Sequence, residues 1–497
     1  MSMFKWDVVY DGKTPPPGKA VAPDERLSWG RTVGLGAQHV VAMFGATFVF
    51  PLIMGLNAQL AIMMSGIATI CFLLIVQGKV PSYLGTSAAF VGGAFAIYGQ
   101  GGDPADVTGA VLIAGIVLAL VGVLIHFVGA RALHRVLPPV VTGAVVMLIG
   151  FNLAPVVANV YWPQDQWVAL LTMAAVILMA VGLRGFLGRI AILLGLVFGY
   201  LVSWLFDQFG KVTSVLPGQN LLDANGDPCS PEGTYCVATA FEHSRINWDG
   251  VRAADWIGFP PASDFANGIV GYHAPTFSFA FILLMLPAVI ALIAENAGHV
   301  KAVAEMTERD LDPYMGRAIG ADGVGTVIAS AVGGSPTTTY AENIGVMAAT
   351  RIYSTAAYFV AALVAILFGL SPKFGALVSA VPGGVLGGIT VVLYGMIGLL
   401  GAKIWTENRV KFSNPVNLVP IAAGIIIAIG DTTLTVTDDF QLSGIALGTI
   451  VVLVAYHVAR AIAPADLKEE DVNLIVVDRP GVQTTGTGAD GERTNRP

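Results

Sequence analysis

Apolar stretches of roughly 18–22 residues, the length that crosses ~30 Å of hydrocarbon as a helix, recur along the whole chain. In lipid, a spanning segment must satisfy its own backbone hydrogen bonds, and a helix does this without help from its neighbours. The sequence therefore predicts an all-α polytopic membrane protein. The fourteen predicted segments are 33–54, 58–77, 83–98, 107–128, 137–157, 166–183, 189–207, 276–297, 317–333, 340–353, 355–371, 384–403, 415–430 and 441–462.

Composition supports this class and excludes others. Charged residues make up 12% of the 497 residues, hydrophobic residues 55%, and the mean hydropathy is +0.73. A soluble domain carries about 25% charged residues, which cover its surface. The composition therefore excludes a soluble enzyme and a disordered scaffold. The net charge of −7 argues against a nucleic-acid partner.

The positions of Lys and Arg predict the orientation. If the N-terminus is cytoplasmic, only Lys211, Arg245, Arg252 and Lys373 of the 26 basic residues lie outside. An excess of basic residues in cytoplasmic segments is the rule for such proteins, so we expect both termini in the cytoplasm. The predicted parts are a cytoplasmic N-terminal segment 1–30, a first repeat 31–207, an extracytoplasmic loop 208–275, a second repeat 276–462 and a disordered cytoplasmic tail 463–497.

The long loop holds two of the three cysteines, Cys229 and Cys236. On the oxidising side of the membrane they could form a small disulfide, and the alternative is two unpaired surface thiols. The cysteines and histidines form no metal-binding spacing.

The two halves of the chain are similar in kind. Seven predicted spans precede the loop and seven follow it, so the second half must be inverted. The third span of each half is interrupted, by "VPSYLGTSAAFVGG" in one and "GGSPTTTYAENIGV" in the other. Paired interruptions in inverted repeats indicate a transporter's binding site near the bilayer midplane. The alternative is that these small residues only allow close helix packing.

Four ionisable residues in the predicted spans are candidates for function: His39, Glu295, His299 and Glu342. A carboxylate at membrane depth costs ~2.5–3.5 kcal/mol and usually faces the protein interior. Glu295 and His299 are four residues apart, on one helix face, and could together load a proton. Alternatively, His299 solvates the helix end near Lys301.

Glu342 begins a half-length helix, where a carboxylate is stabilised by the helix dipole. It is either a plain N-terminal charge or a site residue. His39 is either a polar residue of the helix bundle or a ligand. Two converging carboxyl groups favour a substrate with N–H donors and argue against an anion.

These residues carry a resemblance to a known family. The string "ENIGVMAATR", Glu342–Arg351, matches the motif of the nucleobase–ascorbate transporter family. Three further strings, "QHVVAMFGATFVFP", "AENAGHVKAV" and "VPGGVLGGITVVLYG", resemble its first, eighth and twelfth spans. The resemblance covers residues 25–462. An acid at the first motif position resembles uracil permeases, and strings such as "VAPDERL" and "DPYMGRA" resemble the branch used in bacterial pyrimidine utilisation.

The resemblance implies a fold of 7+7 inverted repeats in the bacterial cytoplasmic membrane. Spans 1–4 and 8–11 would form a core domain and spans 5–7 and 12–14 a gate domain. Short antiparallel β-strands would lie in spans 3 and 10. It also implies a homodimer formed through the gate domain.

The family's site residues map onto this chain by segment. Glu295 and Glu342 would bind ring N–H groups of a base, and His299 would be the partner of Glu295. Backbone amides would come from Ala88 and Ala341. The pocket would be lined by Ala46, Tyr340, Tyr394 and Thr390, and proton coupling would involve Glu295, His299 and His39.

The resulting expectation is a proton-coupled uracil symporter with no cofactor and no enzymatic activity. Ala88 stands where the bacterial uracil permease pattern has Phe, Ala341 where it has Gly, and Thr390 where it has Ser. Loss of the Phe ring could enlarge the pocket, which leaves open a broader permease that takes thymine, xanthine or uric acid. An anion carrier or channel on the same fold is the alternative of another class.

Overall fold

The computed structural model describes residues 5–13, 15–16, 19–129, 137–184, 186–214, 241–265, 268–430, 432–437, 440–442, 444–465 and 467–468. The predicted pair Cys229 and Cys236 lies outside the described residues, as does most of the tail predicted to be disordered. The side chain of Ala46, predicted to line the pocket, is likewise not among those described.

Helices occur in every predicted apolar segment. Before the long loop they are α1 (Trp29–Ile53), α2 (Ala58–Ile75), α3 (Val91–Gly99), α4 (Pro104–Val128), α6 (Pro139–Asn152), α8 (Gln166–Gly182) and α10 (Ala191–Asp207). After it come α12 (Phe279–Met285), α13 (Pro287–Thr307), α14 (Met315–Ser330), α15 (Ala341–Thr350), α16 (Thr355–Gly369), α17 (Pro372–Ser379), α18 (Gly383–Glu407), α19 (Pro415–Ile429) and α20 (Gly444–Ile462).

Not all of these helices have the length of a full span. Within the described ranges, seven helical stretches are long and apolar enough to cross a membrane, or eight if the bent pair α16 and α17 counts as one. Four further apolar helical stretches have 10–17 residues. The chain is therefore a mostly helical protein, and its described part holds seven to eight apolar spans of full length.

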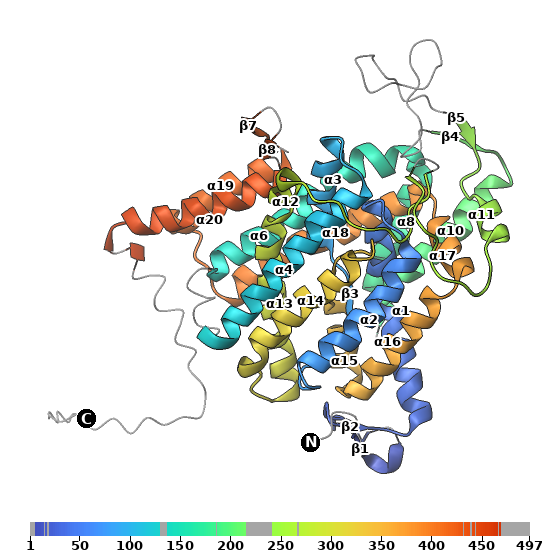
Figure 1. Ribbon diagram of the computed structural model, residues 1–497, viewed down its shortest axis with the longest axis horizontal. Coiled ribbons are helices and arrows are strands. Elements are labelled where there is room, and N and C mark those ends of the chain that lie inside the picture. Colours follow the sequence, from blue (N-terminus) through green and yellow to red (C-terminus); the bar gives the residue numbers. More distant parts are fainter. Residues whose placement is uncertain are drawn as a thin grey trace, which may run out of the picture.

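The helices pack in two groups (Figure 1). In the first bundle, α4 packs against α14, and α2 packs against α14 and α16, with α1 beside α16. In the second bundle, α18 packs against α6 and α8, and α19 packs against α20 and α6. Helix α13 lies at the boundary, because it contacts α4 and α14 on one side and α6 and α20 on the other.

Glycines of α4 and α14 bring these two helices into close contact. A Cβ placed on Gly122 would lie 2.2 Å from the backbone nitrogen of Gly320, and one on Gly316 would lie 2.4 Å from that of His126. Any side chain at these positions would force the helices apart. Small residues thus bring the two backbones into direct contact, as is common between membrane helices.

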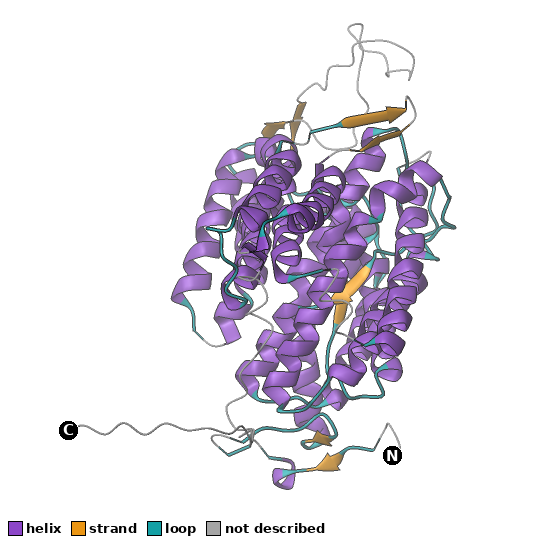
Figure 2. Cartoon of the chain, turned by 90° about the vertical axis from the view of Figure 1, so that its left-hand side faces the viewer, coloured by secondary structure: helices purple, strands orange, loops and turns teal. Residues whose placement is uncertain are grey.

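Two short strands pair among the helices, as predicted for spans 3 and 10 (Figure 2). Strand β3 (Leu84–Thr86) pairs antiparallel with β6 (Thr337–Thr339), with Gly85 opposite Thr338. Prolines at 81 and 336 precede the strands, and proline interrupts a helix because it lacks an N–H donor. The other described strands form two-stranded sheets at the periphery: β1 (Asp7–Val8) with β2 (Glu25–Arg26), β4 (Val212–Ser214) with β5 (Phe241–His243), and β7 (Leu434–Thr437) with β8 (Phe440–Leu442).

The N-terminal segment and the long loop lie on opposite sides of the molecule (Figure 1). Val21 donates its N–H to Arg351 O at 2.9 Å, so the N-terminal segment packs where α15 ends. Asp24 pairs with Arg309, beyond the C-terminal end of α13, at 2.7 Å. We call this the terminus side, and the opposite side, which carries β4 and β5, the loop side.

Candidate functional site

The strand pair has a helix start at each of its two ends. The short 3-10 helix Ala88–Phe90 begins two residues after β3 ends, and α15 begins two residues after β6 ends. Because the two strands are antiparallel, the helix starts lie at opposite ends of the pair, which is only about 10 Å long, and flank it from both sides. The first N–H groups of a helix have no partner within it, so those of Ala88 and Ala341 can bind a ligand.

The two predicted carboxylates lie near each other beside this strand pair. Glu295 of α13 lies within electrostatic range of both Glu342 and Asp322. The Tyr340 hydroxyl is within the same range of Glu342 and Glu295. The structure therefore brings Glu295 and Glu342 together, although they are on different helices.

Asp322 was not among the predicted site residues. It lies in α14, is fully buried, and accepts a hydrogen bond from Asn296 Nδ2 at 2.6 Å. The signal was available in the sequence, since Asp322 is a lone carboxylate within the predicted span 317–333.

A hydrogen-bond chain leads from Asp322 to His299. Thr339 Oγ1 donates to Asn296 Oδ1 at 2.8 Å, and His299 Nδ1 lies 2.7 Å from Thr339 Oγ1. The sequence predicted Glu295 as the partner of His299, whereas the hydrogen bond of His299 goes to Thr339 on the strand. These hydrogen bonds link α14, α13 and β6 into one polar network.

His39 lies against α15 and α16. Asn343 Nδ2 donates to His39 O at 3.0 Å and lies 3.3 Å from His39 Nδ1. The ring of Tyr358 lies over the imidazole, with 4.4 Å between centroids. The side chain is buried. These contacts favour the interpretation of His39 as a polar residue of the helix bundle.

The predicted pocket tyrosines have different surroundings. Tyr340 is buried; its hydroxyl donates to Thr86 O at 2.8 Å and accepts from Thr47 at 3.1 Å, so it holds the strand pair. Tyr394 of α18 stacks on Phe50 of α1, with centroids 6.4 Å apart and rings 8° from parallel. This stack joins the first and second bundles.

Thr390 lies one turn before Tyr394 and is fully buried. Its hydroxyl donates to Leu386 O at 2.7 Å within the same helix. The hydroxyl hydrogen is therefore already used by the α18 backbone, and Thr390 can contribute to a pocket through its methyl group or as a hydrogen-bond acceptor.

Exposed positions lie next to the site and continue towards the terminus side. Ala341 is exposed although the neighbouring Tyr340 and Asn343 are buried, so the start of α15 borders open space. On α13, Gly298 and Glu305 are exposed on the face that carries the partly buried Glu295. These positions follow one another at helical spacing towards the C-terminal end of α13.

The geometry suits a neutral ligand that both donates and accepts hydrogen bonds. Carboxylates accept N–H donors, and free backbone N–H groups donate to carbonyl oxygens. Within the described ranges, no group of three His, Cys, Asp or Glu residues is placed to hold a metal ion.

Comparison with known proteins identifies the family. The model of the xanthine/uracil permeases, described as "Permease family", matches residues 30–437. The chain is 41% identical over 456 residues to the "Putative pyrimidine permease RutG" of Escherichia coli (strain K12), covering 90% of this chain and 94% of that protein. It is 35% identical over 437 residues to the "Uracil permease" of Bacillus caldolyticus, covering 86% and 91%.

Solved structures of low sequence identity share the fold. The transmembrane domain of the cyanobacterial bicarbonate transporter BicA aligns with a TM-score of 0.51 at 13% identity, covering 86% of this chain and 96% of that one. The murine anion transporter Slc26a9, in its inward-facing state, aligns with a TM-score of 0.58 at 11% identity, covering 87% and 68%. Together, the family match and the full-length relatives show that this chain is a multi-pass membrane transporter, not an enzyme, and belongs to the xanthine/uracil permease family.

Proposed function

We propose that this protein imports uracil together with a proton. The observation that carries the proposal is the convergence of Glu295 and Glu342 beside two helix starts. Uracil has two ring N–H donors and two carbonyl acceptors, which such a site can match. The relatives named as uracil and pyrimidine permeases support the same substrate class.

The two carboxylates favour a nucleobase over an anion. A carbonyl oxygen of the base would accept from the free N–H of Ala88 or Ala341, while each ring N–H would donate to a carboxylate. An anionic substrate would be repelled by Glu295, Glu342 and Asp322. This chain shares its fold with bicarbonate and anion transporters, but the shared fold does not imply an anionic substrate, because the chemistry of a site is set by its own residues.

Transport would proceed by alternating access of a core domain against a gate domain. The first bundle, with both strand–helix segments, would be the core, and the second bundle the gate. The complete assembly would have fourteen segments in 7+7 inverted repeats, and two chains would pair through their gate domains. The positive-inside rule assigns the terminus side to the cytoplasm, so a site open to that side is inward-facing.

Proton coupling would use the carboxylate cluster. Glu295 lies within electrostatic range of both other carboxyl groups, so it is repelled by each of them when all are ionised, and a proton on Glu295 stabilises the empty site. An entering proton gains ~2.3 kcal/mol per 100 mV, which corresponds to roughly 50-fold accumulation of a neutral substrate. Glu295 is the proposed carrier, since it faces both other carboxylates. His299 and His39 are further candidates.

A competition assay tests the substrate. Cells expressing the protein take up radiolabelled uracil in the presence of unlabelled uracil, thymine, xanthine, uric acid or ascorbate. We expect uracil to compete best and ascorbate not at all. Stronger competition by xanthine than by uracil would refute a pyrimidine site, and equal competition by thymine would establish the broader permease that the small Ala88 permits.

A second assay tests the coupling. A protonophore and alkaline buffer should both abolish accumulation above the external concentration. Accumulation that persists under both conditions would exclude proton coupling. Uptake that does not saturate and carries current would indicate a channel.

A further inference from the structure

A segment of the long loop connects the two bundles on the loop side. We call residues His243–Gly258 the strap; it contains the short helix α11 (Trp248–Ala253). The strap begins beside the second bundle and ends on the first. Both ends are held by specific bonds.

Arg245 fixes the start of the strap to the second bundle. Its Nε lies 2.6 Å from Asp165 Oδ2, and its Nη1 lies 3.2 Å from Asp207 Oδ1. The side chains of the three residues are only 8–14% exposed. The backbone N–H groups of Arg245 and Ile246 also donate to the Asp207 carboxylate, at 3.0 and 3.2 Å.

Lys373 of α17 fixes the other end to the first bundle. Its Nζ donates to Val251 O at 2.9 Å and to Arg252 O at 3.2 Å, and its backbone N–H donates to Asp255 O at 2.7 Å. Gly258 donates to Leu370 O at 2.9 Å. Helix α17 packs against α2 and α16, so these bonds hold the strap to the first bundle.

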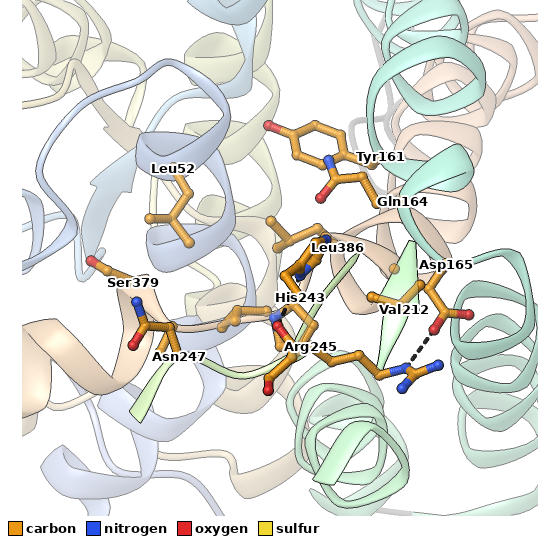
Figure 3. A pocket seen from close by; sticks show the side chains of 16 residues that line it. Leu52, Tyr161, Gln164, Asp165, Val212, His243, Arg245, Asn247, Ser379 and Leu386 are labelled. Carbon is orange, nitrogen blue, oxygen red and sulfur yellow. Dashed lines mark hydrogen bonds and ion pairs between the residues drawn. The ribbon is translucent and has the colours of Figure 1, made fainter. Parts of the chain in front are cut away.

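The start of the strap lines a cavity of about 330 Å³ (Figure 3). Tyr161, Gln164 and Leu386 line it from the second bundle, and Leu52 from the first. The strap adds His243, Ser244, Arg245 and Asn247 to the polar wall, which also includes Asp165 and Ser379. In Figure 3, the Arg245 side chain extends past this cavity to Asp165.

We propose that the strap is an external latch and that the Arg245 pairing holds the loop side closed. The latch rests on two parts of the proposed function: that the two bundles move against each other, and that the loop side faces the cell exterior. When the loop side opens, the distance between Asp207 and Lys373 must change. Because the strap is short and bonded at both ends, it cannot follow this change in distance without releasing one of its two attachments. Arg245 is thus a positioning residue that sets the balance between the closed and open loop side.

The test measures access to the cavity from outside. Leu52→Cys is introduced in a chain that also carries Cys71→Ala, Cys229→Ser and Cys236→Ser. The labelling rate with a membrane-impermeant maleimide is measured in right-side-out vesicles, without and with Arg245→Met. We expect Arg245→Met to raise the rate at least several-fold. Asp207→Asn, which keeps the volume but removes the charge, should raise it in the same direction.

Arg252→Met is the matched control. Arg252 lies on the same strap, but its side chain is 78% exposed and reaches Asp249 only at 3.9 Å. Its replacement should leave the labelling rate unchanged. Unchanged labelling in both Arg245→Met and Asp207→Asn, or an equal rise in Arg252→Met, would overturn the latch.

The same labelling separates the latch from the proposed function. The same labelling in inside-out vesicles tests the orientation of the protein. If Leu52→Cys is labelled only in inside-out vesicles, the assignment of the loop side to the cell exterior is wrong. Uracil uptake is measured in parallel, so a failure of substrate selectivity or proton coupling leaves the accessibility result intact.

Discussion

The two interrupted segments share a scaffold and differ in chemistry. In each, a threonine of the preceding long helix holds the first residue of the strand. Thr69 Oγ1 of α2 accepts from Leu84 N at 2.9 Å, and Thr326 Oγ1 of α14 accepts from Thr337 N at 3.1 Å. Three residues after each strand, however, one segment has the buried Ala89 and the other has Glu342.

This difference shows how an inverted repeat can bind an asymmetric ligand. Both halves supply a strand and the free N–H groups of a helix start. Only the second half adds a carboxylate and the contact from Asn343 to His39. The backbone is thus repeated, while the side chains that recognise the ligand are not.

The largest expected effect comes from removing the carboxylate that distinguishes the second segment. Glu342→Gln keeps the side-chain volume but replaces the charged carboxylate acceptor with a neutral amide. A hydrogen bond to a charged group contributes ~1.5–3 kcal/mol, so uracil binding should weaken about 10- to 100-fold. Binding to purified protein measures this. Glu407→Gln, a surface acid paired with Lys403, is the control and should bind normally. Near-normal uptake by Glu342→Gln would remove this residue from the site.

Glu295 faces the second segment from α13, and its replacement separates binding from coupling. Glu295→Gln imitates the protonated carboxyl group. We expect accumulation above the external concentration to be lost, while some exchange of labelled uracil across the membrane remains. Uptake and counterflow in the same vesicles distinguish the two. If the Glu295→Gln protein still concentrates uracil with wild-type pH dependence, Glu295 is not the proton carrier, and Glu342 or His39 would take that role.

The centre of the strand pair is also asymmetric, with Gly85 opposite Thr338. A Cβ on Gly85 would lie 2.5 Å from Tyr340 Cζ and 2.6 Å from Thr47 Oγ1. Gly85→Ala should therefore displace Tyr340 and lower the free energy of unfolding by ~1–3 kcal/mol. Thermal unfolding in detergent measures the change. An unchanged melting temperature would show that the Tyr340 ring moves aside freely.

The two threonines test whether the scaffolds are equivalent. Thr69→Val and Thr326→Val each leave a buried strand N–H without its partner, at ~1–3 kcal/mol. Thr326 should have the larger effect, because it also donates to Thr337 O at 2.9 Å, whereas Thr69 lies 3.4 Å from Leu84 O. Melting temperatures of the two variants give the comparison. A larger loss in Thr69→Val would reverse the order.

The smallest effect is expected in the long loop. If Cys229 and Cys236 pair, mass spectrometry without reduction should find both protected from alkylation. Alkylation of both would establish free thiols. Cys229→Ser with Cys236→Ser should leave uracil uptake within about twofold of wild type in either case, because both predicted repeats lie outside this part of the loop. A marked loss of uptake would contradict that separation.

The sequence by itself determined the membrane class and the position of each apolar helix, because a segment that crosses lipid must be apolar and internally bonded. The paired interruptions at 83–98 and 340–353 were also readable, since a proline next to a run of small polar residues disfavours a continuous helix. The resemblance of the motif at Glu342 indicated the family for the same local reason: these residues are consecutive in the chain.

Only the tertiary structure decided which partners these residues have. His299 was predicted to pair with Glu295 from their spacing on one helix, yet its hydrogen bond goes to Thr339, a contact across elements that no local spacing encodes. Asp322 joins the cluster because glycines of α4 and α14 let these backbones meet and place α14 beside α13 and β6. The strap depends on Arg245 reaching Asp165, eighty residues earlier in the chain. Packing over such separations depends on all the intervening elements at once, so it is settled only when the chain folds.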